Sequence, residues 1–142
     1  MMEKLVLKNR VDELQKLNVF IDELLEKWSM PPNMGVNVNL ALEEVFSNIV
    51  FYAFDDDKEH DIIFQFDQLK QGVNITVTDA GKAFDPLQTP PPDDLEKPAE
   101  ERHIGGLGIH FVRSVMDEIS YKRQDNKNVL RLTKYNSREN RA

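Results

Sequence analysis

Cysteine is absent from this chain of 142 residues. Its absence excludes disulfide bonds, thiolate zinc sites and cysteine nucleophiles, and it is typical of proteins kept in a reducing compartment. Long apolar runs are missing too, because none approaches the roughly 18 residues that a membrane-spanning helix needs. The N-terminal MMEKLVLKNR carries mixed charge and has no apolar segment of the kind found in secretory signals. We therefore expect a cytoplasmic protein without a membrane partner.

Positive charge is scarce, since 18 Lys and Arg residues stand against 25 Asp and Glu residues, for a net charge of −7. Non-specific binding to nucleic acids needs a basic face, and the C-terminal Lys and Arg residues are scattered. We therefore expect no nucleic-acid partner. The length is that of one ordinary domain, and we expect a single domain over 1–136 with a flexible tail at 137–142.

The first forty residues predict a short strand followed by an amphipathic helix. Residues 3–8 alternate as in a strand, and Asn9 is a candidate helix N-cap with Asp12 at position N3. Apolar residues recur at three- and four-residue steps from Leu14 to Trp28. Counted from the cap at Asn9, this pattern predicts a helix of about five turns, with Trp28 in the core. The prolines that follow end this helix.

The next segments predict a second helix and a hairpin. The helix runs from about 33 to 54, with a core stripe at Leu42, Val45, Phe46, Ile49, Val50 and Ala53. Two alternating strands follow, over about 62–67 and 73–78, and the short link at 70–72 reads as a turn. Two further strands are expected at about 119–122 and 129–134.

A segment rich in proline and acid separates the hairpin from the last helix. It carries five prolines between 85 and 101, which excludes a helix or a central strand, and a long loop of this kind is often functional. We interpret residues 85–104 as a mobile lid, followed by a helix over about 108–117. The order β-α-α-β-β-lid-α-β-β predicts the α+β class, as a two-layer sandwich with helices covering one face of a mixed, mostly antiparallel sheet.

Glu44 and Asn48 form the first candidate functional pair. Four residues apart, they lie about 40° apart on one helix face, among apolar neighbours. A partly buried carboxylate needs a partner, which Mg²⁺ and a phosphorylated ligand would supply. The ordinary alternative is a surface glutamate beside a satisfied asparagine.

Thr78-Asp79-Ala80-Gly81 lies at the end of a predicted strand. Strand ends commonly carry ligand-binding loops. Asp79 can accept a hydrogen bond from an exocyclic amino group, and Gly81 lets a ligand approach the backbone closely. The ordinary alternative is a turn that ends the strand.

Gly105-Gly106-Leu107-Gly108 precedes the last helix. Free N–H groups at a helix N-terminus, next to the positive end of its dipole, form a phosphate site. No G-K-[ST] sequence follows, so this is no P-loop, and no strand precedes it as in a Rossmann fold. The ordinary alternative is a flexible loop that meets a helix.

Taken in order, these motifs resemble the Bergerat ATP-binding fold of gyrase, heat-shock chaperones, histidine kinases and mismatch-repair ATPases. The most similar branch is the anti-sigma-factor serine/threonine kinases. The resemblance rests on ALEEVFSNIVFYAF at 41–54, VTDAGKAFDP at 77–86 and IGGLGIHFVRSVMDEISYKR at 104–123. It covers nearly the whole chain.

The resemblance implies a role for each matching residue. Glu44 would be the general base that activates a hydroxyl, and Asn48 would ligate Mg²⁺ between the phosphates of ATP. Asp79 would read the adenine amino group, with Gly81 packed against the base. The remaining implied nucleotide-binding residues are Phe84, Arg102, Gly105, Gly106, Leu107 and Gly108, with Arg102 assigned to the γ-phosphate.

The implied function is transfer of the ATP γ-phosphate to a hydroxyl of an antagonist (anti-anti-sigma) protein, combined with sequestration of a sigma factor and so with control of transcription. Relatives of this kind often form homodimers. Two alternatives remain open: a nucleotide-gated binding switch with little catalysis, and a stand-alone ATPase domain in another signalling complex.

Two departures from the family pattern bear on the rate of phosphoryl transfer. Phe51-Tyr52-Ala53 stands where many relatives carry a histidine, and this change would dry the site. Asn128-Val129 stands where some relatives have Gly-Thr, which removes a hydroxyl contact to the nucleotide. Both departures favour the binding switch slightly.

Overall fold

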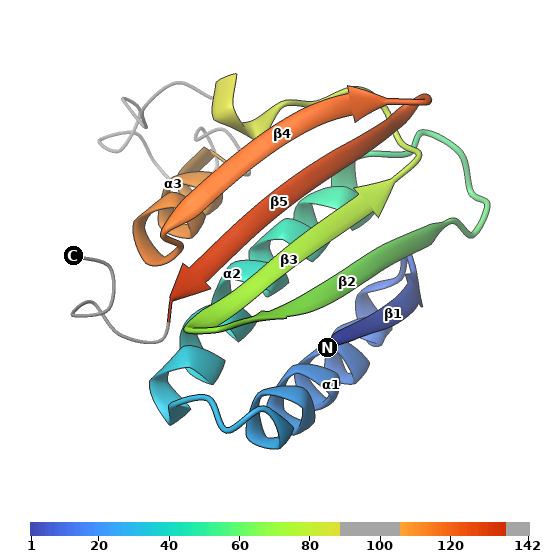
Figure 1. The fold of residues 1–142 in the computed structure, drawn as a ribbon. Helices are drawn as coiled ribbons and strands as arrows, with labels where there is room; N and C mark the ends of the chain where they lie inside the picture. Colours follow the sequence, from blue (N-terminus) through green and yellow to red (C-terminus); the bar gives the residue numbers. More distant parts are fainter. Residues whose placement is uncertain (89–105, 136–142) are drawn as a thin grey trace.

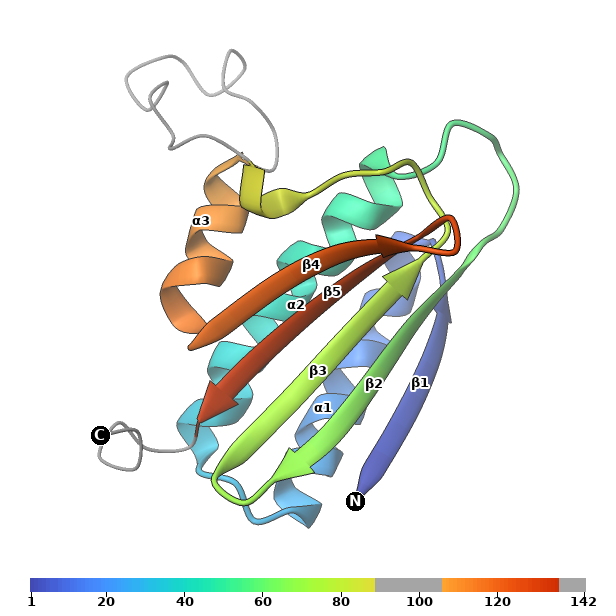
Figure 2. The same cartoon turned by 45° about the horizontal axis from the view of Figure 1, so that its top comes forward.

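The computed structural model describes residues 1–88 and 106–135. Three helices, α1 (Leu14–Lys27), α2 (Pro32–Tyr52) and α3 (Gly106–Val115), lie on one face of a single sheet (Figures 1 and 2). The strands are β1 (Met2–Lys8), β2 (Asp61–Leu69), β3 (Gly72–Asp79), β4 (Glu118–Gln124) and β5 (Lys127–Tyr135), in the order β1-β2-β3-β5-β4. Single turns of 3-10 helix stand at Val11–Glu13 and Pro86–Gln88. The predicted α+β sandwich with helices on one face is confirmed.

Every strand pairing within the described residues is antiparallel, where a mixed sheet was expected. After α3, β4 runs in the same direction as β3, so these two strands could in principle form a parallel pair. However, β5 folds back from β4 and inserts between β3 and β4 (Figure 1). β3 and β4 run in the same direction but are therefore not neighbours.

The core lies between the sheet and the helices. Strand residues of one parity point inward and are buried, as their alternation predicts. They are Ile62, Phe64 and Phe66 on β2 and Val73, Ile75 and Val77 on β3. From α2, Phe46 meets Phe64 with ring centroids 6.2 Å apart. Trp28 is buried at the end of α1, as predicted. Full burial of one such side chain stabilises the fold by about 1.5–3 kcal/mol.

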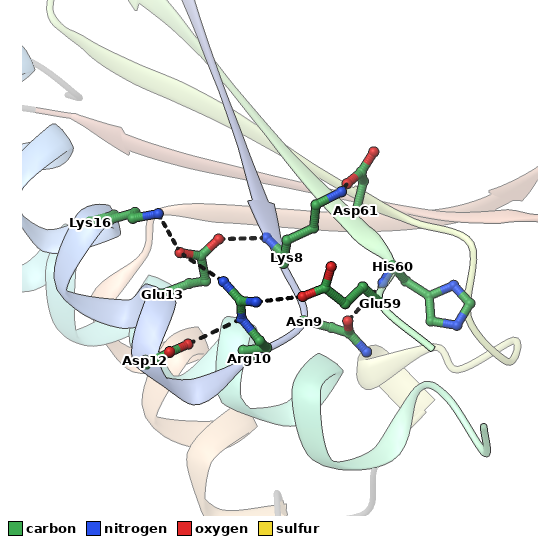
Figure 3. Close-up of polar contacts among 9 residues, drawn as sticks. All are labelled: Lys8, Asn9, Arg10, Asp12, Glu13, Lys16, Glu59, His60 and Asp61. Atoms are coloured by element: carbon green, nitrogen blue, oxygen red, sulfur yellow. Dashed lines mark hydrogen bonds and ion pairs between the residues drawn. The ribbon is translucent and has the colours of Figure 1, made fainter. Parts of the chain in front are cut away.

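A charged corner joins the end of β1 to the start of β2 (Figure 3). The buried Glu13 accepts a hydrogen bond from the backbone N–H of Lys8 at 2.9 Å and pairs with Lys16 at 2.7 Å. Arg10 bridges to Glu59, next to β2. This corner fixes the turn that leads into α1.

The predicted N-cap at Asn9 is wrong. A turn of 3-10 helix over Val11–Glu13 comes first, and α1 begins at Leu14 without a side-chain cap. The Asn9 side chain instead accepts a hydrogen bond from the backbone N–H of His60, at 2.8 Å. This contact joins residues 51 positions apart, so local sequence rules give no sign of it.

The interpretation of residues 85–104 as a lid falls mostly outside the described residues, and so do the tail at 137–142 and the residues Arg102 and Gly105. No helix in the described ranges is long and apolar enough to cross a membrane.

Candidate functional site

A cavity of about 310 Å³ lies where the end of β3 and the start of β5 meet α2 and α3. Its wall is mostly apolar, with a few polar groups. The residues that line it are Val45, Asn48, Ile49, Tyr52, Ala53, Val77, Asp79, Lys82, Ala83, Phe84, Pro86, Ile109, Tyr121, Asn128 and Leu130. Apolar cavities with a few convergent polar groups are the usual form of small-molecule sites.

Helix α2 supplies one wall through residues at three- and four-residue steps, and Asn48 is the polar member of this face. The Asn48 Nδ2 atom is buried and has no hydrogen-bond partner within the described part of the chain. An unsatisfied buried polar atom costs about 1–3 kcal/mol. Such a group facing a cavity fits a polar ligand that would complete its hydrogen bonds.

Glu44 lies one helical turn before Asn48 and is half-buried. It is not among the residues that line the cavity, so the structure places it beside the cavity and not within it. The neighbouring Glu43 is engaged elsewhere, because its carboxylate accepts a hydrogen bond from Asn18 on α1 at 3.4 Å. Of this acidic pair, Glu44 is therefore the one next to Asn48.

Asp79 is the buried acid of the cavity, with 5% of its surface exposed. It follows Val73, Ile75 and Val77 on the inward face of β3, so strand alternation turns its carboxylate toward the helices. Its Oδ1 accepts hydrogen bonds from the Gly81 N–H at 2.8 Å and from Asn128 Nδ2 at 3.1 Å. Burial raises the pKa of Asp79, and these two hydrogen bonds oppose the rise.

Gly81 allows the loop after β3 to dock on the end of α2. A Cβ atom at this position would lie 2.5 Å from the Ala53 side chain and 2.6 Å from the Ala53 carbonyl oxygen. The next residue, Lys82, donates its backbone N–H to that same carbonyl at 2.8 Å. The D-x-G spacing therefore has a structural reason, since any side chain at position 81 would push the loop off α2.

Phe84 lines the cavity from the same loop, as its predicted place in the site requires, and 55% of its surface is exposed. Its backbone N–H donates to Asn128 Oδ1 at 3.2 Å. The ring therefore stands at the rim of the cavity, on a backbone that is held from β5.

Asn128 and Tyr121 also line the cavity. From the sequence, Asn128 stood out only as part of a departure from the family pattern, and Tyr121 had no expected role. The pairing of β3 with β5 sets Asn128 directly opposite Asp79. The Tyr121 hydroxyl donates to Asn128 Oδ1 at 2.5 Å. The alternation of β4 and β5 predicts that both side chains face the helices. It does not predict the strand register that places them next to Asp79.

The glycine-rich segment opens α3, which begins at Gly106 and not near Gly108 as predicted. Leu107 and Gly108 therefore lie in the first turn, where backbone N–H groups have no partner within the helix. Ile109, next in this turn, lines the cavity. The positive end of the α3 dipole thus lies at the cavity, and such an end favours anions.

In chemical terms, the arrangement combines a mostly apolar cavity with a buried carboxylate that can accept a hydrogen bond. An amide and a nearby acid stand along α2, and a helix N-terminus lies at the same cavity. Each of these groups matches one part of a nucleotide: the base, the metal-bound phosphates and the phosphate oxygens.

Comparison with known proteins gives one consistent result. The family model described as "Histidine kinase-like ATPase domain" matches residues 7–134. The chain is 30% identical to the serine/threonine-protein kinase BtrW of Bordetella bronchiseptica, over 82% of this chain and 80% of that protein. It is 29% identical to the serine-protein kinase RsbW of Halalkalibacterium halodurans, over 72% of this chain and 64% of that protein.

Among solved structures, the chain is similar to that of the RsbU and RsbW domains of Rv1364c from Mycobacterium tuberculosis. The TM-score is 0.70 at 14% identity, over 97% of this chain and 33% of that one. This likeness concerns the fold.

Proposed function

Because the chain belongs to the histidine kinase-like ATPase domain family, we propose that it is an ATP-dependent serine/threonine-protein kinase of the anti-sigma-factor type. The resemblance noted from the sequence is confirmed by relatives that are themselves named as serine/threonine- or serine-protein kinases. The observation that carries the proposal is the buried carboxylate of Asp79 in a mostly apolar cavity of about 310 Å³.

Adenine would enter the apolar part of the cavity and donate its exocyclic amino group to Asp79. The Oδ2 atom is the acceptor, because Oδ1 already receives two hydrogen bonds and Oδ2 receives none from the described residues. Guanine carries a carbonyl oxygen at the corresponding position, which a carboxylate repels. This pairing predicts a preference for ATP over GTP.

Mg²⁺ and the phosphates would lie between Asn48 and the first turn of α3. The unpartnered amide of Asn48 fits such a group, because rotation by 180° about its terminal bond presents either its oxygen or its nitrogen. Magnesium takes oxygen ligands and commonly binds through substrate phosphates with one or two protein groups. We assign the phosphate oxygens to the backbone N–H groups of residues 105–108, and Arg102 to the γ-phosphate.

Phosphoryl transfer depends mainly on positioning and on neutralisation of charge. Bound ATP supplies the γ-phosphoryl group. Glu44, one turn from Asn48, would take the proton of the acceptor hydroxyl as a general base. Its half-buried position beside the cavity suits this role, since the hydroxyl must come from another protein.

The partners we propose are a sigma factor, which the protein would sequester, and an antagonist protein that carries the phosphorylated hydroxyl. A homodimer and a cytoplasmic location fit the same family. The chain covers 64% of the RsbW relative from Halalkalibacterium halodurans, so partner contacts made by that protein outside the shared region are not carried over.

One observation favours the alternative of a nucleotide-gated switch with little catalysis. Tyr52 and Asn128, at the two departures from the family pattern, both line the cavity. A binding-only protein would take up ATP and leave every partner unphosphorylated.

Calorimetric titration with ATP and Mg²⁺, and then with GTP, tests the nucleotide site. Saturable binding of ATP is expected, with GTP bound far more weakly. If the folded protein binds neither nucleotide, the kinase proposal fails. Incubation with labelled ATP and the candidate antagonist protein then separates the kinase from the switch, since only the kinase transfers label.

A further inference from the structure

Asn128 is the most densely bonded side chain of the cavity, and its hydrogen-bonding capacity is fully used. A primary amide has two N–H donors and two acceptor lone pairs. Nδ2 donates to Asp79 Oδ1 at 3.1 Å and to the Lys82 carbonyl oxygen at 2.8 Å. Oδ1 accepts from the Phe84 backbone N–H at 3.2 Å and from the Tyr121 hydroxyl at 2.5 Å.

These partners also fix which way the amide points. On one side Asn128 meets a carbonyl and a carboxylate oxygen, which only accept, and on the other it meets a backbone N–H, which only donates. A flipped amide would place like groups together at three of the four contacts. The residue is buried, with 7% of its surface exposed, so water offers little compensation.

We propose that Asn128, held by Tyr121, is the positioning residue that sets the base selectivity of the nucleotide site. It fixes Asp79 so that Oδ1 is occupied and Oδ2 is left for the base, and it holds the loop 82–84 that forms the rim of the cavity. This inference rests on the proposed nucleotide site. Asn128 lines the cavity, but its four hydrogen bonds are all made within the protein. It therefore acts through Asp79 and this loop and not by a hydrogen bond to the ligand.

Two cations near Asp79 do not replace this amide. Arg123 donates to the Gly81 carbonyl oxygen at 2.8 Å and forms no salt bridge among the described residues, although its charge acts to lower the pKa of Asp79. Lys82 on the rim pairs with the exposed Asp55. Neither donates a hydrogen bond to the Asp79 carboxylate. Removal of the Asn128 amide would leave Oδ1 with the Gly81 N–H alone.

Asn128→Ala and Tyr121→Phe test the proposal by titration with ATP and GTP. In Asn128→Ala we expect ATP to bind about tenfold or more weakly and GTP binding to stay as in the wild type, so that the selectivity narrows. Tyr121→Phe removes only the hydroxyl that donates to Asn128 and leaves β4 intact. It should lower the ratio of ATP to GTP affinity by a smaller factor. An ATP-to-GTP ratio unchanged in both variants would overturn the proposal.

Asn74→Ala is the matched control. Asn74 is an equally buried amide, 6% exposed, that joins the same two strands through a 3.0 Å hydrogen bond from Thr133, on the sheet face away from the helices. This variant should lose stability and keep the wild-type ratio of ATP to GTP affinity. A ratio that falls as far in Asn74→Ala as in Asn128→Ala would reduce the effect to general loosening of the sheet and overturn the positioning role.

A measurement without nucleotide separates this inference from the proposed function. Carbon-13 NMR of the Asp79 carboxyl group reports its pKa directly, and loss of the Asn128 donor should raise that pKa further in Asn128→Ala than in Asn74→Ala. If the wild type binds no ATP but the pKa of Asp79 rises as expected, the nucleotide proposal fails while the positioning of Asp79 by Asn128 holds. An unchanged pKa of Asp79 in Asn128→Ala overturns the inference whatever the protein binds.

Discussion

Asp79 is a residue that the cavity holds at a cost to stability. Burial raises its pKa, so the folded state binds a proton more readily than the unfolded chain does. The contribution of Asp79 to the free energy of unfolding is therefore most favourable at acid pH. It falls as the pH rises from about 3.9, the pKa of Asp in the unfolded chain, through the raised pKa of the folded state. At neutral pH the buried, ionised carboxylate lowers the free energy of unfolding. Such a destabilising group is expected where a side chain binds a ligand.

The variant Asp79→Asn should therefore lose ATP binding without losing stability. An amide keeps one acceptor for the Gly81 N–H but can place a donor where the adenine amino group would approach. We expect ATP affinity to fall by about 1.5–3 kcal/mol, while the urea midpoint at pH 7 stays equal or rises. Titration calorimetry and urea unfolding measure the two quantities. Normal ATP binding by this variant would place the base elsewhere.

Glu44 can be tested against its own neighbour. Glu44→Gln should cut phosphoryl transfer to a protein acceptor by about 10²-fold or more and leave ATP affinity within a few-fold, because a general base acts on the hydroxyl. Glu43→Gln is the control, since the Glu43 carboxylate contacts Asn18 on α1. Equal rates in Glu44→Gln and the wild type would remove Glu44 from the mechanism.

At the scale of elements, the sequence predicts helices and strands well because their periodicity reflects which face is buried. The alternation over β2 and β3 is present in the structure as predicted. The predicted apolar stripe of α2 is buried at Leu42, Val45 and Phe46, whereas its C-terminal half, at 49, 50 and 53, is only half-buried. The local sequence does not predict strand register or contacts between residues that are far apart in the chain. Asn9 bonds to His60 instead of capping α1, and Asn128 meets Asp79 across 49 positions of the chain. Neither partner is visible in a local pattern.

The corner between β1 and α1 gives a prediction about pH. Hydrogen bonds from Lys16 and from the Lys8 backbone N–H lower the pKa of Glu13 in the folded state. The stability that these bonds provide is fully present above the pKa of Glu in the unfolded chain, about 4.3. It is lost as the pH falls through the lower pKa that Glu13 has in the folded state. In Glu13→Gln we expect lower stability at pH 7, and a difference from the wild type that shrinks below about pH 4.3.

Urea midpoints measured from pH 7 down to pH 3.5 test this prediction. Glu23→Gln, at an exposed position on α1, is the control and should follow the wild type at every pH. A Glu13→Gln curve that stays a constant distance below the wild type would mean that packing, and not charge, holds the corner.

At the scale of the whole molecule, the candidate site is assembled from distant parts of the chain. Helix α2 contributes Asn48, β3 contributes Asp79, α3 contributes its first turn and β5 contributes Asn128. Motif order identified α2, β3 and α3 from the sequence. For β5, the sequence marked 128–129 only as a departure from the family pattern and gave Asn128 no role, because β5 reaches the site by inserting between β3 and β4.

A site drawn from so many elements couples ligand binding to global unfolding. A ligand that binds only the folded state at 100 times its Kd adds about 2.7 kcal/mol of stability. For a domain of this length we expect ATP with Mg²⁺ to raise the Tm by roughly 5–10 °C. Scanning calorimetry with ATP, with GTP and with no nucleotide measures the shift, and Asp79→Asn is the control that should shift far less. A wild-type Tm that moves equally with ATP and GTP would show that the phosphates alone are bound, and the reading of the base by Asp79 would have to be abandoned.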